Sequence, residues 1–312
     1  MSPDGVGASI VTNVERVLLG KGPQVRLVVA ALLARGHVLI EDAPGVGKTL
    51  LAKAVARSIG GTVGRVQGTA DLLPADITGV TIFDQERRDW DFRPGPLFNH
   101  VLLVDEINRA TPRAQSALLE AMAEGHVTVD GSQHELPEPF LVLATQNPFG
   151  DAGTFPLIAG EYDRFAVSVS LGLPGREVER ELLRGNGGIA ALDGLGPVTD
   201  PNGLAACQRA VASLHVATAV EDYVLDIAEA TRAGSTRLNG ERGISPRATQ
   251  ALLAVAKGYA ATAGRSYVTP DDVQAVANAV LAHRMQGDTM VGLTAASAAV
   301  AEMLTSVAVP TV

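Results

Sequence analysis

The chain has 312 residues, of which 34 are Asp or Glu and 25 are Lys or Arg, so its formal net charge is −9. A protein that grips nucleic-acid phosphates needs a basic surface and often aromatic platforms for bases, yet only 4% of these residues are aromatic. Charged residues also interrupt each apolar run well before the ~20 residues that a membrane-spanning helix requires. Composition therefore argues against nucleic acid as a partner and against a membrane span.

The N-terminal residues lack the basic start and the apolar stretch of a secretory signal. Cys207 is the single cysteine, which can form no intrachain disulfide and supplies too few ligands for a cysteine-based zinc site. We therefore expect a cytoplasmic protein in which this thiol packs inside a helix.

Five short apolar runs, separated by helical patterns, occupy the first half of the chain. They are residues 38–40, 62–66, 101–104, 141–144 and 167–171. Strands this apolar are typical of a parallel sheet with helices on both faces, because a strand with one wet face would alternate polar and apolar residues. The pattern predicts an α/β fold over residues 1–174, with a three-layer αβα core and a parallel sheet.

Strand signals stop after Pro174, and helical patterns fill residues 175–312. Ser245 and Thr269 each precede a proline, which places a capping hydroxyl before a residue suited to the first helical position. Asp200 precedes Pro201 in the same way. We expect a domain boundary near residue 174 and a smaller all-α lid domain beyond it.

A glycine-rich turn follows the first predicted strand and leads into a helical pattern over residues 50–59. This context is typical of a P-loop, in which backbone N–H groups and a helix N-terminus hold phosphates. Lys48 is expected to reach the β- and γ-phosphates of ATP, and Thr49 to bind Mg²⁺. Asp42 stands where the usual pattern has a glycine, which puts a carboxylate near an anion site. The predicted nucleotide-binding residues of this turn are Pro44, Gly45, Val46, Gly47, Lys48, Thr49 and Leu50. The alternative is a chance Gly-Lys-Thr sequence at a strand-to-helix turn.

Two carboxylates, Asp105 and Glu106, end the predicted strand at 101–104. Ligands of such sheets bind at the carboxyl ends of the strands. Asp105 is suited to hold Mg²⁺ through water, and Glu106 to orient and deprotonate the attacking water. As a solvated acidic pair the two would be unremarkable, but beside a P-loop the catalytic interpretation is favoured.

Three further polar residues are candidates for catalysis. Asn147 follows the strand at 141–144 and could bond the attacking water or a phosphate oxygen, although an Asn-Pro turn is the ordinary alternative. Arg164 precedes the last predicted strand and could reach the γ-phosphate of a neighbouring subunit, or simply be solvated. Arg247 lies in the first turn of a helix, where the helix dipole disfavours a cation unless an anion offsets it.

Together these motifs resemble the MoxR family of AAA+ ATPases. The matching stretches are Gly-Val-Gly-Lys-Thr at 45–49, Val-Asp-Glu-Ile-Asn-Arg-Ala at 104–110, Ala-Thr-Gln-Asn-Pro at 144–148 and Ser-Pro-Arg-Ala at 245–248. Further stretches fit at 71–79, 92–97, 115–122 and 269–273. The resemblance therefore runs nearly end to end. The sequence departs from the family at 158–160, where Ile-Ala-Gly replaces the usual Pro-Glu-Ala.

The resemblance implies a helix-2 insert at about 79–91, a helical lid, a hexameric ring, and partners with von Willebrand A domains. By position it makes Asn147 the sensor 1 residue, Arg164 the arginine finger and Arg247 the sensor 2 residue. It also places residues 17–21, including Leu19 and Gly20, beside the adenine.

The leading hypothesis is Mg²⁺-dependent ATP hydrolysis that drives remodelling of a protein client. In this hypothesis Arg247 senses the nucleotide of its own subunit, Arg164 senses that of a neighbour, and the lid swings against the core. There are two alternatives, a helicase-like nucleic-acid motor and the motor subunit of a metal chelatase. The first is supported by two basic residues in the insert, Arg87 and Arg88.

Overall fold

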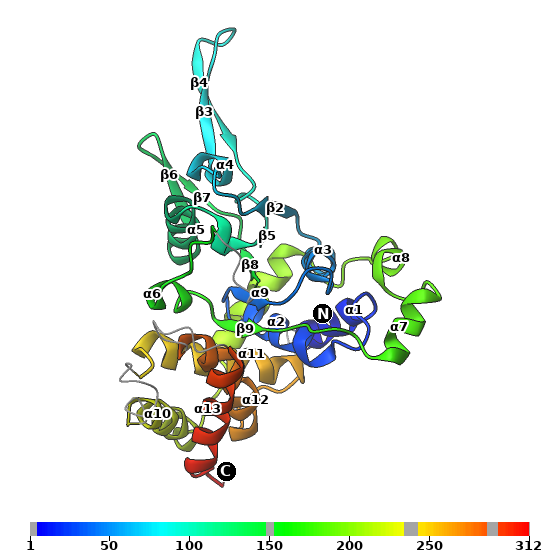
Figure 1. Ribbon diagram of the computed structural model, residues 1–312, viewed down its shortest axis with the longest axis vertical. Coiled ribbons are helices and arrows are strands. Elements are labelled where there is room, and N and C mark those ends of the chain that lie inside the picture. The colour runs from blue at the N-terminus through cyan, green and yellow to red at the C-terminus, as the bar shows by residue number, and fades with distance from the viewer. Residues whose placement is uncertain (1–4, 148–152, 234–242, 286–292, 312) are drawn as a thin grey trace.

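The computed structural model describes residues 5–147, 153–233, 243–285 and 293–311. A parallel sheet of five strands forms its centre, in the spatial order β2-β5-β8-β1-β9 (Figure 1). The strands are Val63–Gln67 (β2), Val101–Asp105 (β5), Leu141–Gln146 (β8), Val38–Glu41 (β1) and Val167–Val169 (β9). The five predicted strands and the α/β class of the core are confirmed.

Two strands differ from their predictions by two residues at the end of the strand. Strand β8 extends through Thr145 and Gln146, which pair with Ile40 and Glu41 of β1. Strand β9 ends at Val169, two residues before its predicted end, because the next residues turn toward Asp42. Both differences lie at the carboxyl edge of the sheet, where side chains outside the strands decide how far the pairing continues.

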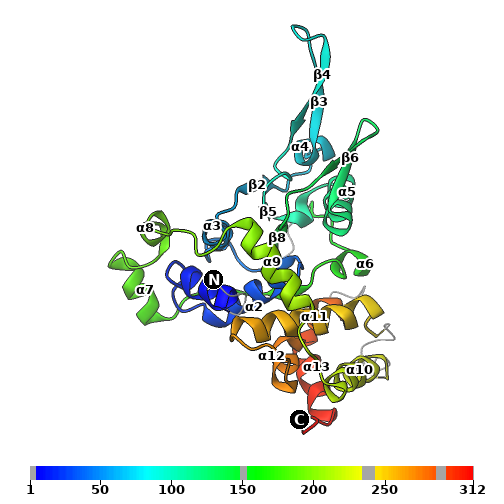
Figure 2. The same ribbon diagram turned by 180° about the vertical axis from the view of Figure 1, so that it is seen from behind.

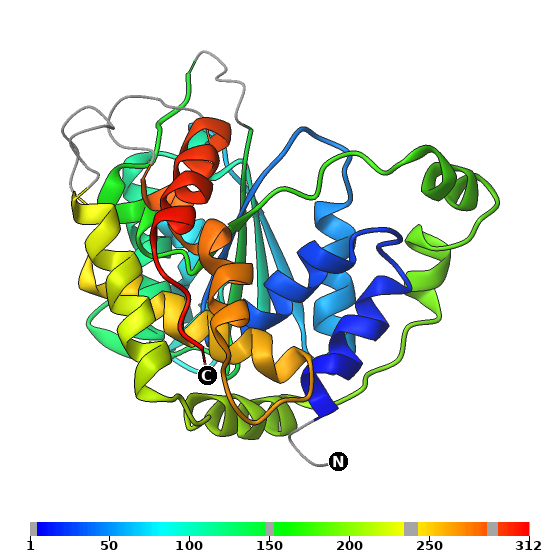
Figure 3. The same cartoon turned by 90° about the horizontal axis from the view of Figure 1, so that it is seen from below.

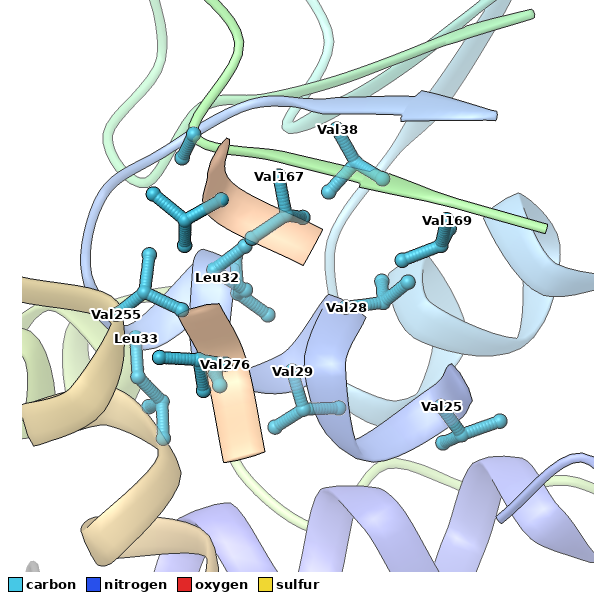
Figure 4. Packing of buried hydrophobic residues seen from close by; sticks show 14 of the residues in the cluster. Val25, Val28, Val29, Leu32, Leu33, Val38, Val167, Val169, Val255 and Val276 are labelled. Carbon is cyan, nitrogen blue, oxygen red and sulfur yellow. The ribbon is translucent and has the colours of Figure 1, made fainter. Parts of the chain in front are cut away.

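Helices cover both faces of the sheet, and the side chains of each strand alternate between two apolar clusters. Val38 and Ile40 of β1 pack into the cluster formed with α1 (Val6–Glu15), α2 (Gly22–Leu33) and α3 (Lys48–Ser58). Leu39, between them, packs into the cluster formed with α5 (Pro112–Glu124) on the other face. Figure 4 shows part of the first cluster, in which valines of β1 and β9 meet those of α2, α11 (Pro246–Thr262) and α12 (Pro270–Leu281). Burial on both faces explains why β1, β5 and β8 are continuous apolar runs in the sequence.

The C-terminal helices pack against the side of the core beside α2 (Figure 3). They are α9 (Pro201–Ala212), α10 (Thr218–Ala233), α11 (Pro246–Thr262), α12 (Pro270–Leu281), η4 (Ala282–Arg284) and α13 (Leu293–Ser306). Helix α11 approaches α2 so closely that a Cβ on Gly258 would lie 2.1 Å from the carbonyl oxygen of Ala30. The helical region is therefore joined to its own core by a tight, glycine-dependent contact.

Helices α7 (Arg176–Leu183) and α8 (Gly188–Asp193) lie apart from the other C-terminal helices, beside α1 and α3 (Figure 1). The N–H of Gly188 donates to the carbonyl oxygen of Val17 at 2.9 Å, and Arg57 of α3 forms an ion pair with Asp193 at 3.6 Å. These contacts bind the first residues beyond 174 to the N-terminal part of the chain. The boundary at residue 174 stays a prediction.

Two antiparallel hairpins extend from the core. Strands β3 (Gly79–Asp84) and β4 (Asp89–Pro94) follow the short α4 (Pro74–Thr78), and β6 (His126–Val129) pairs with β7 (Ser132–Glu135). The β3–β4 hairpin projects from one end of the molecule, opposite the end that carries α10 and the C-terminus (Figures 1 and 2). It occupies the stretch in which the insert is predicted.

In the part of the chain that the structure describes, no helix is both long enough and apolar enough to cross a bilayer.

Candidate functional site

A pocket of about 350 Å³ opens at the carboxyl edge of the sheet, at the start of α3. Four residues with predicted roles in catalysis, metal binding or phosphate binding through their side chains meet in it: Lys48, Thr49, Asp105 and Glu106. Its remaining lining residues are Pro44, Gly45, Gly47, Leu50, Arg65, Gln67 and Thr145. The parallel order of β1, β5 and β8 brings these groups together, because parallel strands present their carboxyl ends at one edge.

The loop between β1 and α3 has the backbone of an anion cradle. Gly45 and Gly47 have φ angles of 86° and 106°, in the left-handed region where a Cβ is strained. Gly47 precedes α3 and supplies no capping side chain, so the N–H groups of the first turn remain open to an anion. The ammonium of Lys48 donates to the carbonyl oxygen of Asp42 at 2.9 Å, within the same loop. This geometry fits the phosphates of a nucleotide.

The carboxylate of Asp42 turns away from the loop and holds the segment that follows β9. It accepts hydrogen bonds from the N–H groups of Leu171 and Gly172 at 2.5 and 3.1 Å, and from the hydroxyl of Ser170 at 2.8 Å. Asp42 is itself buried. Its negative charge is thus satisfied by three donors, and the residue does not line the pocket.

The acidic pair is held by residues that the sequence did not single out. Asp105 accepts from Nε of Arg65 at 2.8 Å, and Glu106 accepts from Gln67 at 3.2 Å and from Arg109 at 3.0 Å. Arg65 and Gln67 alternate along the edge strand β2, where every second residue is exposed. That alternation is the one signal in the sequence that could have directed attention to them.

Glu106 adopts a left-handed backbone conformation, with φ of 55°, which is uncommon for a residue with a Cβ. The N–H of Glu106 donates to the hydroxyl of Thr145 at 3.0 Å. The backbone of Gly68 is also close, because a Cβ on Gly68 would lie 2.1 Å from the carbonyl oxygen of Glu106. Such a conformation persists only when surrounding contacts enforce it, and Glu106 lines the pocket.

The donor set of the pocket fits magnesium bound together with a nucleotide. Mg²⁺ is usually held by one or two carboxylates, water and substrate phosphates, because it gives up its own water reluctantly. Thr49 and Asp105 supply one hydroxyl and one carboxylate. Among the described residues no group of three His, Cys, Asp or Glu side chains could hold a metal without such a partner.

Residues 17–21, predicted to lie beside the adenine, run between the P-loop and α7. Leu18 is close to Gly47, Leu19 packs against Gly187, and Gly20 packs against Val178. The predicted adenine contacts Leu19 and Gly20 are thus next to the phosphate cradle but outside the pocket lining.

Asn147 directly follows β8 and is partly exposed, and it does not line the pocket. Thr145, two residues earlier, does. Residue 148, which completes the Asn-Pro motif, lies outside the described residues. The family departure at 158–160 falls at the start of α6 (Ala159–Tyr162), where the N–H of Ile158 donates to Glu161 at 2.9 Å. The short helix therefore forms without the usual residues.

Arg164 and Arg247 lie at the opposite, amino edge of the sheet. Arg164 precedes β9, whose Val167 pairs with Val38 at the start of β1, and it donates to the carbonyl oxygen of Leu119 at 2.6 Å. The P-loop begins only after the four residues of β1, about 13 Å further along the strand.

Arg247 is exposed in the first turn of α11. Ser245, two residues earlier, donates to Asp163 just before β9 at 2.8 Å. Burial lowers the pKa of His37, just before β1, to about 4, and the positive charge of Arg247 adds to this effect. Arg247 therefore also lies near the amino edge, and it does not line the pocket of its own chain. The expectation that Arg247 senses the nucleotide of its own subunit stays a prediction.

A parallel sheet with a glycine loop, a lysine and a threonine at the start of a helix, and an acidic pair at the next strand end define a nucleotide-binding ATPase core of the P-loop class. Comparison with known proteins agrees. Residues 37–167 match the ATPase family associated with various cellular activities (AAA), and residues 232–302 match the AAA lid domain.

The uncharacterized protein YeaC of Bacillus subtilis (strain 168) is 42% identical over 275 residues, which cover 88% of this chain and 85% of that protein. The chaperone MoxR1 of Mycobacterium tuberculosis is 40% identical over 287 residues, covering 88% of this chain and 74% of that protein. The crystal structure of a putative ATPase from Cytophaga hutchinsonii superposes with a TM-score of 0.86 at 30% identity, covering 99% of this chain and 96% of that one. This chain belongs to the MoxR family of AAA+ ATPases.

Proposed function

We propose that this chain binds ATP with magnesium, hydrolyses the bond between its β- and γ-phosphates to release ADP and phosphate, and uses the cycle to remodel a protein client. The observation that carries the proposal is the meeting of Lys48, Thr49, Asp105 and Glu106 in one pocket at the start of a helix. Membership of an ATPase family agrees with it.

Each side chain has a role that follows from its chemistry. Lys48 and the first-turn N–H groups of α3 would bind phosphate oxygens, and Thr49 and Asp105 would hold magnesium. When bound, magnesium supplies positive charge that offsets the charge developing on the transferring phosphoryl group. Glu106 accepts a proton from the attacking water, and Gln67 and Arg109 orient its carboxylate.

The two arginines at the amino edge support a ring of identical subunits. Arg164 and Arg247 lie too far from the P-loop of their own chain to line its pocket, so a neighbouring copy is the natural place for the phosphate they would contact. An arginine supplied by a partner offsets charge in the transition state. We propose a hexamer, assembled so that the amino edge of one copy faces the nucleotide of the next.

The proposed client is a protein, with a von Willebrand A domain protein as partner. A relative that matches most of this chain is named a chaperone. The nucleic-acid alternative receives no support from the insert, because Arg87 and Arg88 at its tip are interspersed with Asp84, Glu86 and Asp89, and Arg87 pairs with Asp84.

The test is steady-state ATP hydrolysis with and without Mg²⁺, together with affinity capture by a Glu106→Gln chain held in ATP. We expect Mg²⁺-dependent hydrolysis, a hexameric mass by light scattering, and co-purification of a protein client. Glu229→Gln, the same change at an exposed site on α10, is the matched control. Hydrolysis accelerated by added DNA would favour a nucleic-acid motor instead.

A further inference from the structure

The core and the helical region of the chain are joined at the amino edge by one carboxylate. Asp163 accepts a hydrogen bond from Nε of Arg284 at 2.8 Å and from the hydroxyl of Ser245 at 2.8 Å. Asp163 belongs to the core segment before β9, whereas Ser245 caps α11 and Arg284 ends η4. Three segments that are far apart in the sequence therefore converge on a single side chain.

Arg284 is the buried member of this cluster, which we name the Asp163 clamp (Asp163, Ser245 and Arg284). Its side chain is only 4% exposed, and its guanidinium also donates to the carbonyl oxygens of Phe165 and Ala166 at 2.6 and 3.1 Å. A buried guanidinium that bonds both a carboxylate and the backbone permits little relative movement of the two elements. The clamp is thus a rigid joint between core and helical region.

The clamp lies directly beside both candidate arginines. Arg164 is the next residue after Asp163, and Arg247 is two residues after Ser245. Ser245 also accepts from the N–H of Ala248 at 3.0 Å, so its hydroxyl fixes the first turn of α11, in which Arg247 lies. The hydrogen bond between Ser245 and Asp163 therefore also fixes the position of Arg164 relative to Arg247.

Electrostatics supports this arrangement. The positive charge of Arg247 is close enough to oppose protonation of Arg284 and contributes to lowering its pKa, after burial as the main cause. The pKa is raised in turn by the carboxylate of Asp163. Asp163, from the core, therefore offsets the repulsion between Arg247 and Arg284, which both belong to the helical region.

We infer that Asp163 is a positioning residue, which with Ser245 and Arg284 presents Arg164 and Arg247 as one rigid pair to phosphates bound by a neighbouring copy of the chain. This inference rests on the proposed function. It also implies that the stroke of the motor moves whole subunits against each other, because the clamp opposes a swing of the helical region against its own core.

The first experiment removes only the link at Ser245. Ser245→Ala loses the hydroxyl, Ser245→Thr keeps one, and Asp200→Ala removes the N-cap of α9, which is away from the clamp. We expect Ser245→Ala to lower kcat by about 10-fold or more while KM for ATP changes less than about two-fold, because misplaced catalytic groups cost rate rather than binding. Thermal unfolding of each variant serves as the stability control, and we expect the two lost caps to destabilise the fold to a similar extent. Ser245→Thr restores kcat, and Asp200→Ala leaves it near wild type.

The second experiment mixes two defective chains. Glu106→Gln keeps an intact arginine pair, and Ser245→Ala keeps an intact P-loop, so mixed rings restore complete sites where one meets the other. We expect the mixture to hydrolyse ATP faster than the average of the two chains assayed separately.

Equal kcat for Ser245→Ala and Asp200→Ala, or a mixture no faster than that average, would overturn the inference while leaving ATP hydrolysis by the wild-type chain intact. A wild-type chain that does not hydrolyse ATP would overturn the proposed function and this inference with it.

Discussion

The two edges of the sheet differ in how far apart in the sequence their interacting residues lie. At the carboxyl edge, the loop that leads into α3 provides most of the candidate site from one contiguous stretch, residues 44–50. At the amino edge, the Asp163 clamp joins side chains 82 and 121 residues apart along the chain. The first edge is an open cradle that a ligand completes, whereas the second is already closed by its own charges. The comparison shows that the carboxyl edge leaves polar groups open to a ligand, whereas the amino edge uses its polar groups to join the core to the helical region.

The largest expected effect comes from removing an arginine of the amino edge. Arg164→Ala should lower kcat by about 10³-fold or more, because an arginine supplied by a partner offsets transition-state charge. Arg164→Lys should not restore it, since an ammonium lacks the planar fork of a guanidinium. Steady-state kinetics on the assembled protein measures both. If Arg164→Ala kept near-normal turnover, the amino edge would have no part in the reaction.

At the carboxyl edge, Glu106→Gln should lower kcat by about 10²- to 10⁴-fold while ATP still binds, as expected for the loss of a general base. Equilibrium binding of a fluorescent ATP analogue separates binding from turnover. Glu229→Gln is again the matched control, being exposed and remote from the pocket. Loss of binding in Glu106→Gln would show that this carboxylate shapes the pocket rather than the chemistry.

The amino edge should also make the protein sensitive to acid. Burial lowers the pKa of His37 from 6.5 to about 4, so the unfolded chain binds more protons than the folded chain between these two pH values. We therefore expect the free energy of unfolding to be unaffected by His37 above pH 6.5 and to fall by about 3 kcal/mol as the pH drops to 4. His283, buried at the same edge, also has its pKa lowered by burial and adds to the fall.

Denaturant unfolding over this pH range tests the effect. His37→Gln should flatten the dependence, whereas His215→Gln, which changes an exposed imidazole, should leave it unchanged. Identical slopes in the wild type and His37→Gln would rule out His37 as the source.

The smallest expected effect concerns Asp42, at the carboxyl edge. Asp42→Gly introduces the residue usual at this position and removes three hydrogen bonds to a carboxylate. We expect a loss of about 1.5 to 3 kcal/mol in the free energy of unfolding, with the Kd for ATP changed only a few-fold. Chemical denaturation and calorimetric titration measure the two quantities. Tighter ATP binding by 10-fold or more would mean that the carboxylate repels the phosphates after all.

The sequence predicted the sheet and the phosphate loop because both depend on local patterns. Apolar runs buried on both faces mark the strands, and a glycine loop before a helix is recognisable wherever it occurs. Arg65, Gln67 and Thr145 were missed, since their place in the pocket follows from which strands are neighbours. The functions assigned to the individual site residues stay predictions until they are measured.

The sequence by itself determined the α/β core, its five strands, and the family to which the chain belongs. Only the tertiary structure decided that Asp42 faces the residues after β9, that α7 and α8 lie beside α1 and α3, and that Arg247 stands with Arg164 far from its own P-loop. The physical reason is that strand periodicity and loop chemistry act over a few residues. The partner of a buried charge, by contrast, is chosen by packing between segments more than eighty residues apart.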